Sequence, residues 1–373
     1  MMNYNRFTDH YDELFLKTKE LKKLGDSNSQ LDVLHIIAGI DRAWPLPSWF
    51  AEKSTRWVSF LRKLGYQAKA YVPQFIFPNA DRDIHIEIIQ RIKPRILISR
   101  AFALRGRDLG RMAMVLPETF FIQSNHTPNS FMLEDTCDSP EAWLESVNVT
   151  QFNNNVFLSS VSEMDVNGTQ HLSNKKIIWI PNPCEINGCH NSRVRQNNLL
   201  VIGLGGRTNY QKNLKNQLDA IALVARKKPI KTILFLGKEA SPGMREGFRR
   251  YAQNLFKDIG SELQVFEFVT PAQLGEYAKY HIDLFMQISF DESFGYLNWE
   301  MMSKGIPTIT APNIETLGTI TANPTNIVEM ANAILMASDE LESYKEKSFK
   351  IACEVARNNN KAFANAFKSM LSF

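Results

Sequence analysis

Two glutamates with a fixed spacing are the first residues in this sequence that could do chemistry. Glu292 and Glu300 stand eight positions apart in the stretch SFDESFGYLNWEMMSKGIP. The apolar run before them predicts a strand, and Ser293, Phe294 and Gly295 predict the start of a helix. Unpaired backbone N–H groups at a helix start suit an anion such as a diphosphate, and a glycine lets the anion approach the backbone.

A second role is open to a carboxylate in this place, because it can accept paired hydrogen bonds from a ribose diol. Glu292 falls in the loop and Glu300 two turns into the helix, so the two carboxylates need not share a face. Taken alone, the pair is equally consistent with an ordinary helix that has an acidic first turn and a second glutamate inside it.

A pair of cations follows another apolar run. Arg207 and Lys212 lie in GLGGRTNYQKNLKNQLDAI, directly after the predicted strand LLVIGLGG. Two cations that face a diphosphate neutralise its charge and donate charge-assisted hydrogen bonds to it. A solvated basic loop is the alternative for this pair in isolation.

The elements that position these residues alternate between short apolar runs and helical patterns. Apolar runs that end in polar or glycine residues predict buried strands, and the stretches between them have helical spacing. This alternation predicts parallel, doubly wound α/β sheets. The predicted strands are 33–39, 68–73, 95–99, 119–125, 155–162, 176–183, 199–206, 232–238, 263–269, 283–289 and 307–312.

A polar stretch at residues 185–198 interrupts the alternation, which then restarts. We therefore expect two Rossmann-like domains, over 31–190 and 191–350, with the default ligand site in the cleft between them. Residues 4–24 have the pattern of a charged helix, so 1–30 is expected to be a helical extension. Residues 351–373 are expected to form a C-terminal helix that can cross back to the first domain.

Composition excludes some classes of protein. The 373 residues carry a net charge of only +4, which is too small to indicate nucleic-acid binding by charge alone. We find no apolar signal core and no apolar run of roughly 18 residues, so we expect a cytoplasmic protein, at most peripheral to a membrane. The four cysteines form no CxxC pair. The DRD triplet at 81–83 precedes a helix and is expected to be a solvated loop, so no metal site is expected.

The stretch with the two glutamates resembles the E-x7-E motif of retaining glycosyltransferases with the GT-B fold, especially family 4. The usual form is E-G-F-G-x-x-x-x-E-A-M-A-x-G-x-P-V, and this chain has E-S-F-G-Y-L-N-W-E-M-M-S-K-G-I-P-T. The cationic stretch is similar to the G-R-x-x-x-x-K-N segment of the same family. The resemblance is firm over residues 199–312 and weak before residue 155.

The resemblance implies transfer of a sugar from a nucleotide-diphosphate sugar to an acceptor hydroxyl, with retention of configuration and no metal or other cofactor required. Arg207, Lys212 and the amides near Phe294 and Gly295 would bind the diphosphate, with Gly206 and Ser293 beside it. Glu292 would hold the sugar and Glu300 the ribose. His126, in FIQSNHTP, matches a histidine that contacts the donor sugar, and Gly39, in IIAGI, matches a first-strand glycine.

The chain departs from the family pattern at two places. It has one glycine near position 39 where the family usually has two, and Glu315 only loosely replaces an acid that follows the motif. Because front-face attack assisted by the leaving phosphate is the usual explanation for retention in this family, the two-carboxylate logic of glycosidases does not apply to Glu292 and Glu300.

Several questions stay open at the level of sequence. The donor is a UDP-sugar or a GDP-sugar, and the sequence does not distinguish the two bases. The acceptor belongs to a surface polysaccharide or glycolipid, or else to a macromolecule such as nucleic acid or protein. A non-catalytic sugar-nucleotide-binding relative is a further alternative. A Rossmann dehydrogenase is disfavoured because IIAGIDRAWP lacks G-x-G-x-x-G, and a phosphorylase because this chain is too short.

The acceptor side offers only a weak signal. Residues 91–111 hold seven arginines and lysines against one aspartate, and Trp44, Trp49, Phe50 and Trp57 follow Gly39. Such residues could contact a membrane surface or nucleic acid. The plainer interpretation is that the arginines flank a buried strand and the aromatic residues belong to the core.

Overall fold

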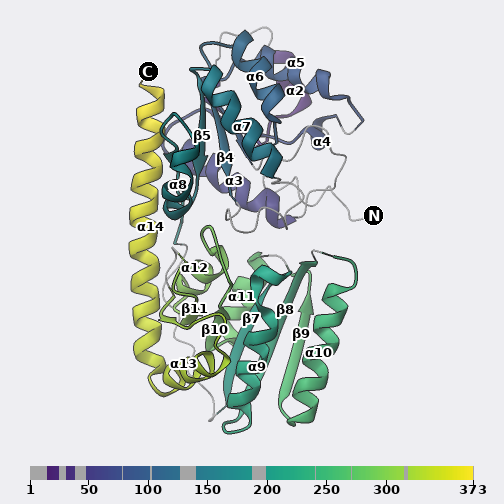
Figure 1. Ribbon diagram of the computed structural model, residues 1–373, viewed down its shortest axis with the longest axis vertical. Helices are drawn as coiled ribbons and strands as arrows, with labels where there is room; N and C mark the ends of the chain where they lie inside the picture. The colour runs from purple at the N-terminus through teal and green to yellow at the C-terminus, as the bar shows by residue number, and fades with distance from the viewer. Residues whose placement is uncertain are drawn as a thin grey trace. The chain divides into compact units, whose positions relative to one another are not determined.

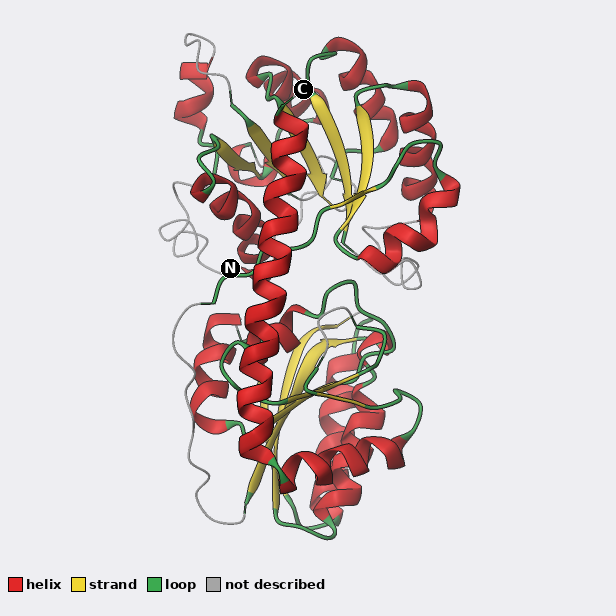
Figure 2. Ribbon diagram, turned by 90° about the vertical axis from the view of Figure 1, so that its left-hand side faces the viewer, coloured by secondary structure: helices red, strands yellow, loops and turns green. Residues whose placement is uncertain are grey.

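The computed structural model describes residues 15–24, 31–37, 48–77, 79–100, 103–126, 140–186, 199–239, 241–269, 271–314 and 318–372. The chain divides into two compact units: unit 1 comprises Met1–Pro183 and Asn359–Phe373, and unit 2 comprises Cys184–Asn358. Each unit contains a six-stranded parallel sheet with helices on both faces, as Figures 1 and 2 show. The alternation in the sequence therefore predicted the fold class correctly.

The sheet of unit 1 has the strand order β2-β1-β3-β4-β5-β6. The chain runs outward from β1 to β2 and then crosses to β3, so the order reverses between β1 and β3. All strands of a parallel sheet end at the same edge, and the loops that follow them gather there. The strands are β1 (Val33–Ile36), β2 (Ala68–Tyr71), β3 (Ile96–Arg100), β4 (Phe120–Asn125), β5 (Val156–Ser160) and β6 (Ile178–Trp179).

Helices cover both faces of this sheet (Figure 1). One face packs apolar residues of α2 (Thr18–Leu24), α5 (Arg82–Ile92), α6 (Gly106–Val115) and α7 (Pro140–Phe152). The other face packs α3 (Ser48–Lys63) and the last turns of α14 (Leu341–Leu371), where Trp57 meets Phe363 and Phe367. The shorter elements are α4 (Pro73–Ile76), α8 (Glu163–Thr169) and η2 (Gln170–Leu172).

The N-terminal segment differs from the helix expected over residues 4–24. In the part that the structure describes, the helix begins only at Thr18. Phe15 forms a parallel bridge with Ala70, and the backbone N–H of Leu16 donates to the Ala70 carbonyl at 2.9 Å. Both side chains are buried in the core. Backbone pairing with the edge of β2 and this burial together keep Phe15 and Leu16 from joining the helix.

The arginines and the tryptophan of unit 1 follow the plainer interpretation. Trp57 is fully buried, and Arg100 is only 6% exposed. Arg91 pairs with Glu87, and Arg95 donates to Asp32 and to the Leu371 carbonyl. Residues 38–47, which include Gly39 and Trp44, and the side chains of Trp49 and Phe50 lie outside what the structure describes. Arg95 and Arg100 therefore serve the fold around β3, whereas Arg107 and Arg111 of α6 are exposed.

The sheet of unit 2 has the strand order β12-β11-β10-β7-β8-β9, with a reversal between β7 and β10. Its first strand, β7, pairs with β10 in the register Ile202 to Leu284 and Leu204 to Met286. The short strand β12 is the only described strand of this sheet that the sequence pattern did not indicate. The strands are β7 (Leu200–Thr208), β8 (Ile230–Glu239), β9 (Glu262–Glu267), β10 (Leu284–Gln287), β11 (Thr308–Thr310) and β12 (Ile320–Thr321).

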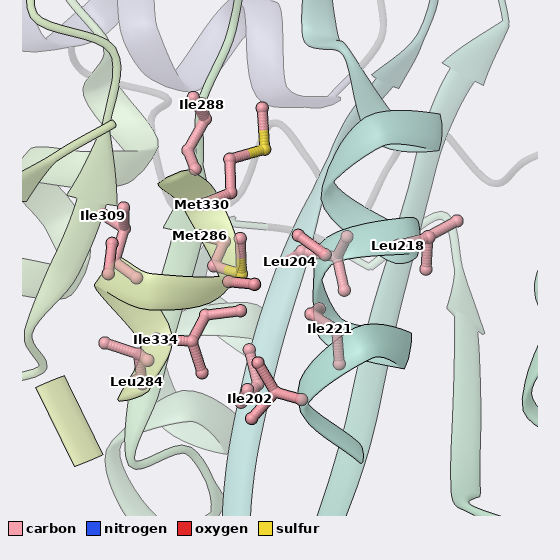
Figure 3. Packing of buried hydrophobic residues seen from close by; sticks show 14 of the residues in the cluster. Ile202, Leu204, Leu218, Ile221, Leu284, Met286, Ile288, Ile309, Met330 and Ile334 are labelled. Carbon is pink, nitrogen blue, oxygen red and sulfur yellow. The ribbon is translucent and has the colours of Figure 1, made fainter. Parts of the chain in front are cut away.

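Two helical layers enclose this second sheet. On one face, α9 (Leu214–Ala225), α10 (Met244–Asp258) and α13 (Ile327–Asp339) bury an apolar cluster against β7, β10 and β11. Figure 3 shows Ile221 of α9 and Ile334 of α13 directed toward Ile202 of β7 within this cluster. The other face packs α11 (Pro271–His281) and α12 (Tyr296–Met302). This continuous apolar packing fixes the strand ends, and so it positions the loops that follow β7 and β10.

Candidate functional site

The predicted cations and the first glutamate meet at one edge of the sheet in unit 2. Arg207 lies near the end of β7, and Lys212 ends η3 (Tyr210–Lys212), a single 3-10 turn. Glu292 follows β10, which pairs with β7 in parallel. Because neighbouring parallel strands end side by side, the two loops that follow them form one site.

The loop after β7 is shaped to turn Lys212 back over the strand end. The side chain of Asn209 accepts a hydrogen bond from the backbone N–H of Lys212 at 3.3 Å and so caps the 3-10 turn. Gly206 has a φ of +150°, and a Cβ built there would lie 3.4 Å from Cγ and Cδ of Lys212. The lysine stem therefore passes directly over Gly206, which explains the glycine at this predicted site position.

Glu292 is buried, and one of its oxygens is a shared acceptor. Oε1 accepts a hydrogen bond from Lys212 Nζ, in a buried ion pair. The same oxygen accepts from Gln287 Nε2 at 2.8 Å and from Ser289 Oγ at 2.9 Å. These three donors fix the carboxylate in one orientation, as a buried charge requires.

The electrostatics of the pair follow from its burial. Burial alone would raise the pKa of Glu292, but the charge and hydrogen bond of Lys212, the Ser289 hydroxyl and the charge of Arg207 lower that pKa below its ordinary value. Burial lowers the pKa of Lys212, and Arg207 adds to the effect, while Glu292 opposes it. Glu292 is therefore the carboxylate partner in an ion pair beside a second cation, Arg207.

The start of α12 lies three residues later than the sequence predicted. Gly295 adopts the left-handed conformation, with a φ of +69°, and the helix runs from Tyr296 to Met302. Phe294 is 3% exposed and packs against Tyr296 and the apolar cluster around Trp299. A glycine is needed at 295 because the left-handed region costs other residues about 1–2 kcal/mol.

Glu300 and Glu292 occupy different environments, as expected. Glu300 lies within α12 and is half-buried, whereas Glu292 lies in the preceding loop and is buried. Ser293 lies in that loop as well and is half-buried. The structure thus brings Gly206, Arg207, Lys212 and Glu292 together at the strand ends, with the 293–300 segment following Glu292 directly.

His126 belongs to unit 1, directly after β4. Its Nε2 lies 3.1 Å from Ser124 Oγ, and its ring centroid lies 5.3 Å from that of Trp57. Trp57 in turn donates from Nε1 to Asn182 Oδ1 at 2.9 Å. These contacts hold the His126 ring at the carboxyl edge of its own sheet. Gly39 and Glu315 lie outside the described residues.

Sequence reasoning missed four polar residues that hold the site together. They are Asn209, Gln211, Gln287 and Ser289, and each is nearly or fully buried. Ser289 and Gln287 hold Glu292, and Asn209 and Gln211 hold the cationic loop. For Gln287 and Ser289, the available signal was a polar residue at the end of an apolar strand. No comparable signal marks the others.

Metal ligation finds no support within the described ranges. Among those residues, no group of three or more His, Cys, Asp or Glu side chains is placed to hold a metal ion. The DRD triplet begins a helix instead: Asp81 accepts from the Ile84 N–H at 3.1 Å and caps α5, and Asp83 lies in its first turn.

The second half of the chain matches a known protein family. Residues 190–366 match the model of the family "Glycosyl transferases group 1". Among curated protein sequences, none is similar enough to count as a relative.

Three solved structures show the same fold at low sequence identity. Sucrose-phosphate synthase from Thermosynechococcus elongatus has a TM-score of 0.66 at 11% identity, over 92% of this chain and 100% of its own. Anabaena HepE in complex with UDP-glucose has a TM-score of 0.62 at 15% identity, over 92% and 100%. The lipopolysaccharide outer core galactosyltransferase WaaB has 0.60 at 12% identity, over 91% and 99%. The two-domain α/β fold of GT-B type is thereby confirmed.

Proposed function

We propose, because residues 190–366 match the glycosyl transferases group 1 family, that the chain transfers a sugar from a nucleotide-diphosphate sugar to an acceptor hydroxyl, with retention of configuration. The observation that carries this proposal is the meeting of Arg207, Lys212 and Glu292 where β7 and β10 end. Two cations and a fixed carboxylate are the groups that a leaving diphosphate and its sugar require.

The cations act on the leaving group. Negative charge grows on the diphosphate as its bond to the sugar breaks, and preorganised cations stabilise such charge without reorganisation. Lys212 is 8% exposed and Arg207 is half-buried, so water screens their charges less than it would at the surface. Gly206 leaves room for the Lys212 stem. We also assign the backbone amides of Ser293, Phe294 and Gly295 to the same phosphates.

The carboxylates and the histidine act on the sugar and the nucleoside. We assign Glu292 to the hydroxyls of the transferred sugar, Glu300 to the ribose diol and His126 to the donor sugar. A carboxylate that accepts two hydroxyl hydrogen bonds fixes the orientation of a sugar ring, which positions the anomeric carbon for front-face attack. Gly39 stays a predicted neighbour of the phosphate or the acceptor.

UDP- or GDP-sugars are the proposed donors. The fold relative HepE was solved in complex with UDP-glucose, which supports keeping UDP among the candidates. For the acceptor we propose a hydroxyl of a surface polysaccharide or glycolipid, since the fold relative WaaB is a lipopolysaccharide galactosyltransferase. Two other results would replace this acceptor assignment. They are transfer to nucleic acid or protein, and binding of the sugar nucleotide without catalysis.

A thermal-shift panel with UDP, GDP, ADP, CMP and their common sugars tests the proposal. A ligand that binds only the folded protein raises its melting temperature. We expect one nucleoside diphosphate and its sugar to give the largest shift, with slow release of the diphosphate from that sugar in an enzyme-coupled assay. A shift without any release, in the presence of a broad acceptor panel, would favour the non-catalytic relative. No shift at millimolar ligand would contradict a nucleotide-sugar site.

We also propose peripheral contact with an anionic membrane through the outer surface of α6. Arg107, Arg111, Met114 and Val115 follow one another along this surface, and Met114 and Val115 are 70% and 55% exposed. Arginines and exposed apolar residues on one helical stripe are typical of helices that lie in a membrane interface. In the described part of the chain, no helix is long and apolar enough to cross a bilayer.

Co-sedimentation with vesicles checks this membrane contact. We expect binding to vesicles of phosphatidylglycerol and phosphatidylcholine that weakens severalfold in the double variant Met114→Ser/Val115→Ser. Val328→Ser, at a 62% exposed position on α13, is the matched control and should leave binding unchanged. Equal binding by the double variant and the control would contradict the assignment of α6.

A further inference from the structure

A buried glutamine links the cationic loop to the acidic loop. Gln211 lies in the middle of η3 and is 1% exposed. Its Oε1 accepts from Arg207 Nη2 at 3.1 Å and from Asn209 Nδ2 at 3.4 Å. Its Nε2 donates to the Asp291 carbonyl at 2.9 Å, and its own carbonyl accepts from the Phe290 N–H at 2.9 Å. Both ends of one amide are therefore used, each toward a different loop.

The contacts of Gln211 need a side chain that both accepts and donates, as a primary amide does. A carboxylate in place of Gln211 could accept from Arg207 but could not donate to the Asp291 carbonyl, and an apolar side chain could do neither. The amide oxygen of Gln211 holds the guanidinium without adding a negative charge beside it. A carboxylate in the same place would neutralise that charge and reduce its attraction for a phosphate.

We infer that Gln211 is a positioning residue for the donor diphosphate: it fixes the Arg207 guanidinium beside Lys212 and keeps the 290–292 segment, which carries Glu292, in register with it. This inference rests on the proposed function and deepens it. Gln211 acts through Arg207 and Glu292. An enzyme without this amide should fold, but its two cations should be less well placed for the diphosphate.

The fold supplies a matched control in Gln217. This residue of α9 is also 1% exposed and also bridges the two loops, since Nε2 donates to the Lys212 carbonyl at 2.7 Å and Oε1 accepts from the Ile288 N–H at 3.0 Å. Within the described part of the chain, its side-chain hydrogen bonds all go to backbone groups, and none goes to Arg207. Gln217 therefore shares the burial and the bridging of Gln211 without the contact that carries the inference.

A double-mutant cycle on nucleoside-diphosphate affinity tests the inference. Titration calorimetry would measure binding of UDP, and of GDP if it binds more tightly, to wild type, Gln211→Met, Arg207→Ala and the double variant. We expect Gln211→Met to lose affinity by about tenfold, the value of one hydrogen bond to a charged group. Because Gln211 acts through Arg207, the double variant should bind within about twofold of Arg207→Ala alone. The same cycle with Gln217→Met should be additive.

Four outcomes would overturn the inference. Additive losses for Gln211 and Arg207, wild-type affinity in Gln211→Met, or the same coupling with Gln217→Met would each reduce Gln211 to a structural role. Failure of wild type to bind any nucleoside diphosphate would instead overturn the proposed function, and this inference with it. The two failures are thus distinguishable by the wild-type titration.

A second variant covers the case in which Gln211→Met does not fold. Gln211→Glu loses the bond to the Asp291 carbonyl but keeps the acceptor for Arg207 as a charge-assisted pair, and its melting temperature reports whether it folds. Its negative charge beside the guanidinium should nevertheless lower diphosphate affinity by at least about tenfold, because it competes with the phosphate for the same cation. Wild-type affinity in Gln211→Glu would contradict the positioning role as well.

Discussion

Replacing Lys212 with methionine is expected to lower kcat/KM for the nucleotide sugar by about 100-fold or more, the usual effect of removing one preorganised group that stabilises transition-state charge. Methionine keeps most of the length and packing of the lysine stem over Gly206. The loss should appear in kcat as well as in donor affinity, since the charge on the diphosphate grows in the transition state.

The same substitution should also destabilise the fold. It leaves the Glu292 carboxylate buried with Gln287 and Ser289 as its remaining donors among the described residues. Removing one member of a buried ion pair costs about 3–5 kcal/mol because the remaining charge is uncompensated. A lower melting temperature could then be mistaken for the cause of lost activity.

The double variant Lys212→Met/Glu292→Gln separates the two effects. It removes both buried charges, and glutamine can still accept from Gln287 and Ser289, so the free energy of unfolding should return to within about 1 kcal/mol of wild type. UDP carries no transferred sugar, so it does not depend on Glu292, and its affinity should stay as low as in Lys212→Met. Recovery of UDP affinity together with stability would show that Lys212 serves the fold alone and would contradict its assignment to the diphosphate.

Glu300→Gln is expected to weaken nucleoside-diphosphate binding by about tenfold to 100-fold while leaving pyrophosphate binding unchanged. A carboxylate that accepts from both hydroxyls of a ribose makes two charge-assisted hydrogen bonds, each of which contributes about 1.5–3 kcal/mol. Pyrophosphate carries no ribose, so its affinity should depend on the two cations and not on Glu300. Glu300 lies within α12 and is half-buried, and the amide variant has the same shape as the carboxylate, so the fold should be kept.

Competition assays with UDP and with pyrophosphate measure both affinities in the same variants. Lys212→Met is expected to lose both ligands, and Glu300→Gln only the nucleotide. Glu346→Gln, at an exposed position of α14, is the matched control and should lose neither. Equal losses of UDP and pyrophosphate in Glu300→Gln would contradict the ribose assignment and would place Glu300 nearer the phosphates.

The fold could be predicted from the sequence because its signals are local and repeated. Every described strand except β12 falls on an apolar run. The helical patterns at 49–65, 84–92, 214–228, 245–260 and 271–280 correspond within a few residues to α3, α5, α9, α10 and α11. The signal failed where tertiary packing overrides a local pattern. Phe15 and Leu16 belong to a segment with a helical pattern. They nevertheless lie outside the helix, because Phe15 bridges to Ala70 of β2 and both side chains pack into the core.

The site was predictable where its chemistry needs charge at fixed spacing. Arg207, Lys212 and Glu292 could be picked out because their charges and spacing match a motif, and the structure brings all three to one sheet edge. The start of α12 was misplaced because Ser293, Phe294 and Gly295 were interpreted as its first residues, whereas the left-handed backbone of Gly295 precedes the helix. Gln211 and Gln217 could not be predicted, because a neutral amide is indistinguishable from a surface residue until its partners are known.

A crystal structure of the protein with the nucleoside diphosphate that stabilises it most would test the central claim most directly. We expect the phosphate oxygens to lie within about 3 Å of the Arg207 guanidinium and the Lys212 ammonium, and the ribose hydroxyls to lie on the Glu300 carboxylate. A diphosphate bound elsewhere, with no contact to either cation, would contradict the assignment of the loops after β7 and β10 as the donor site.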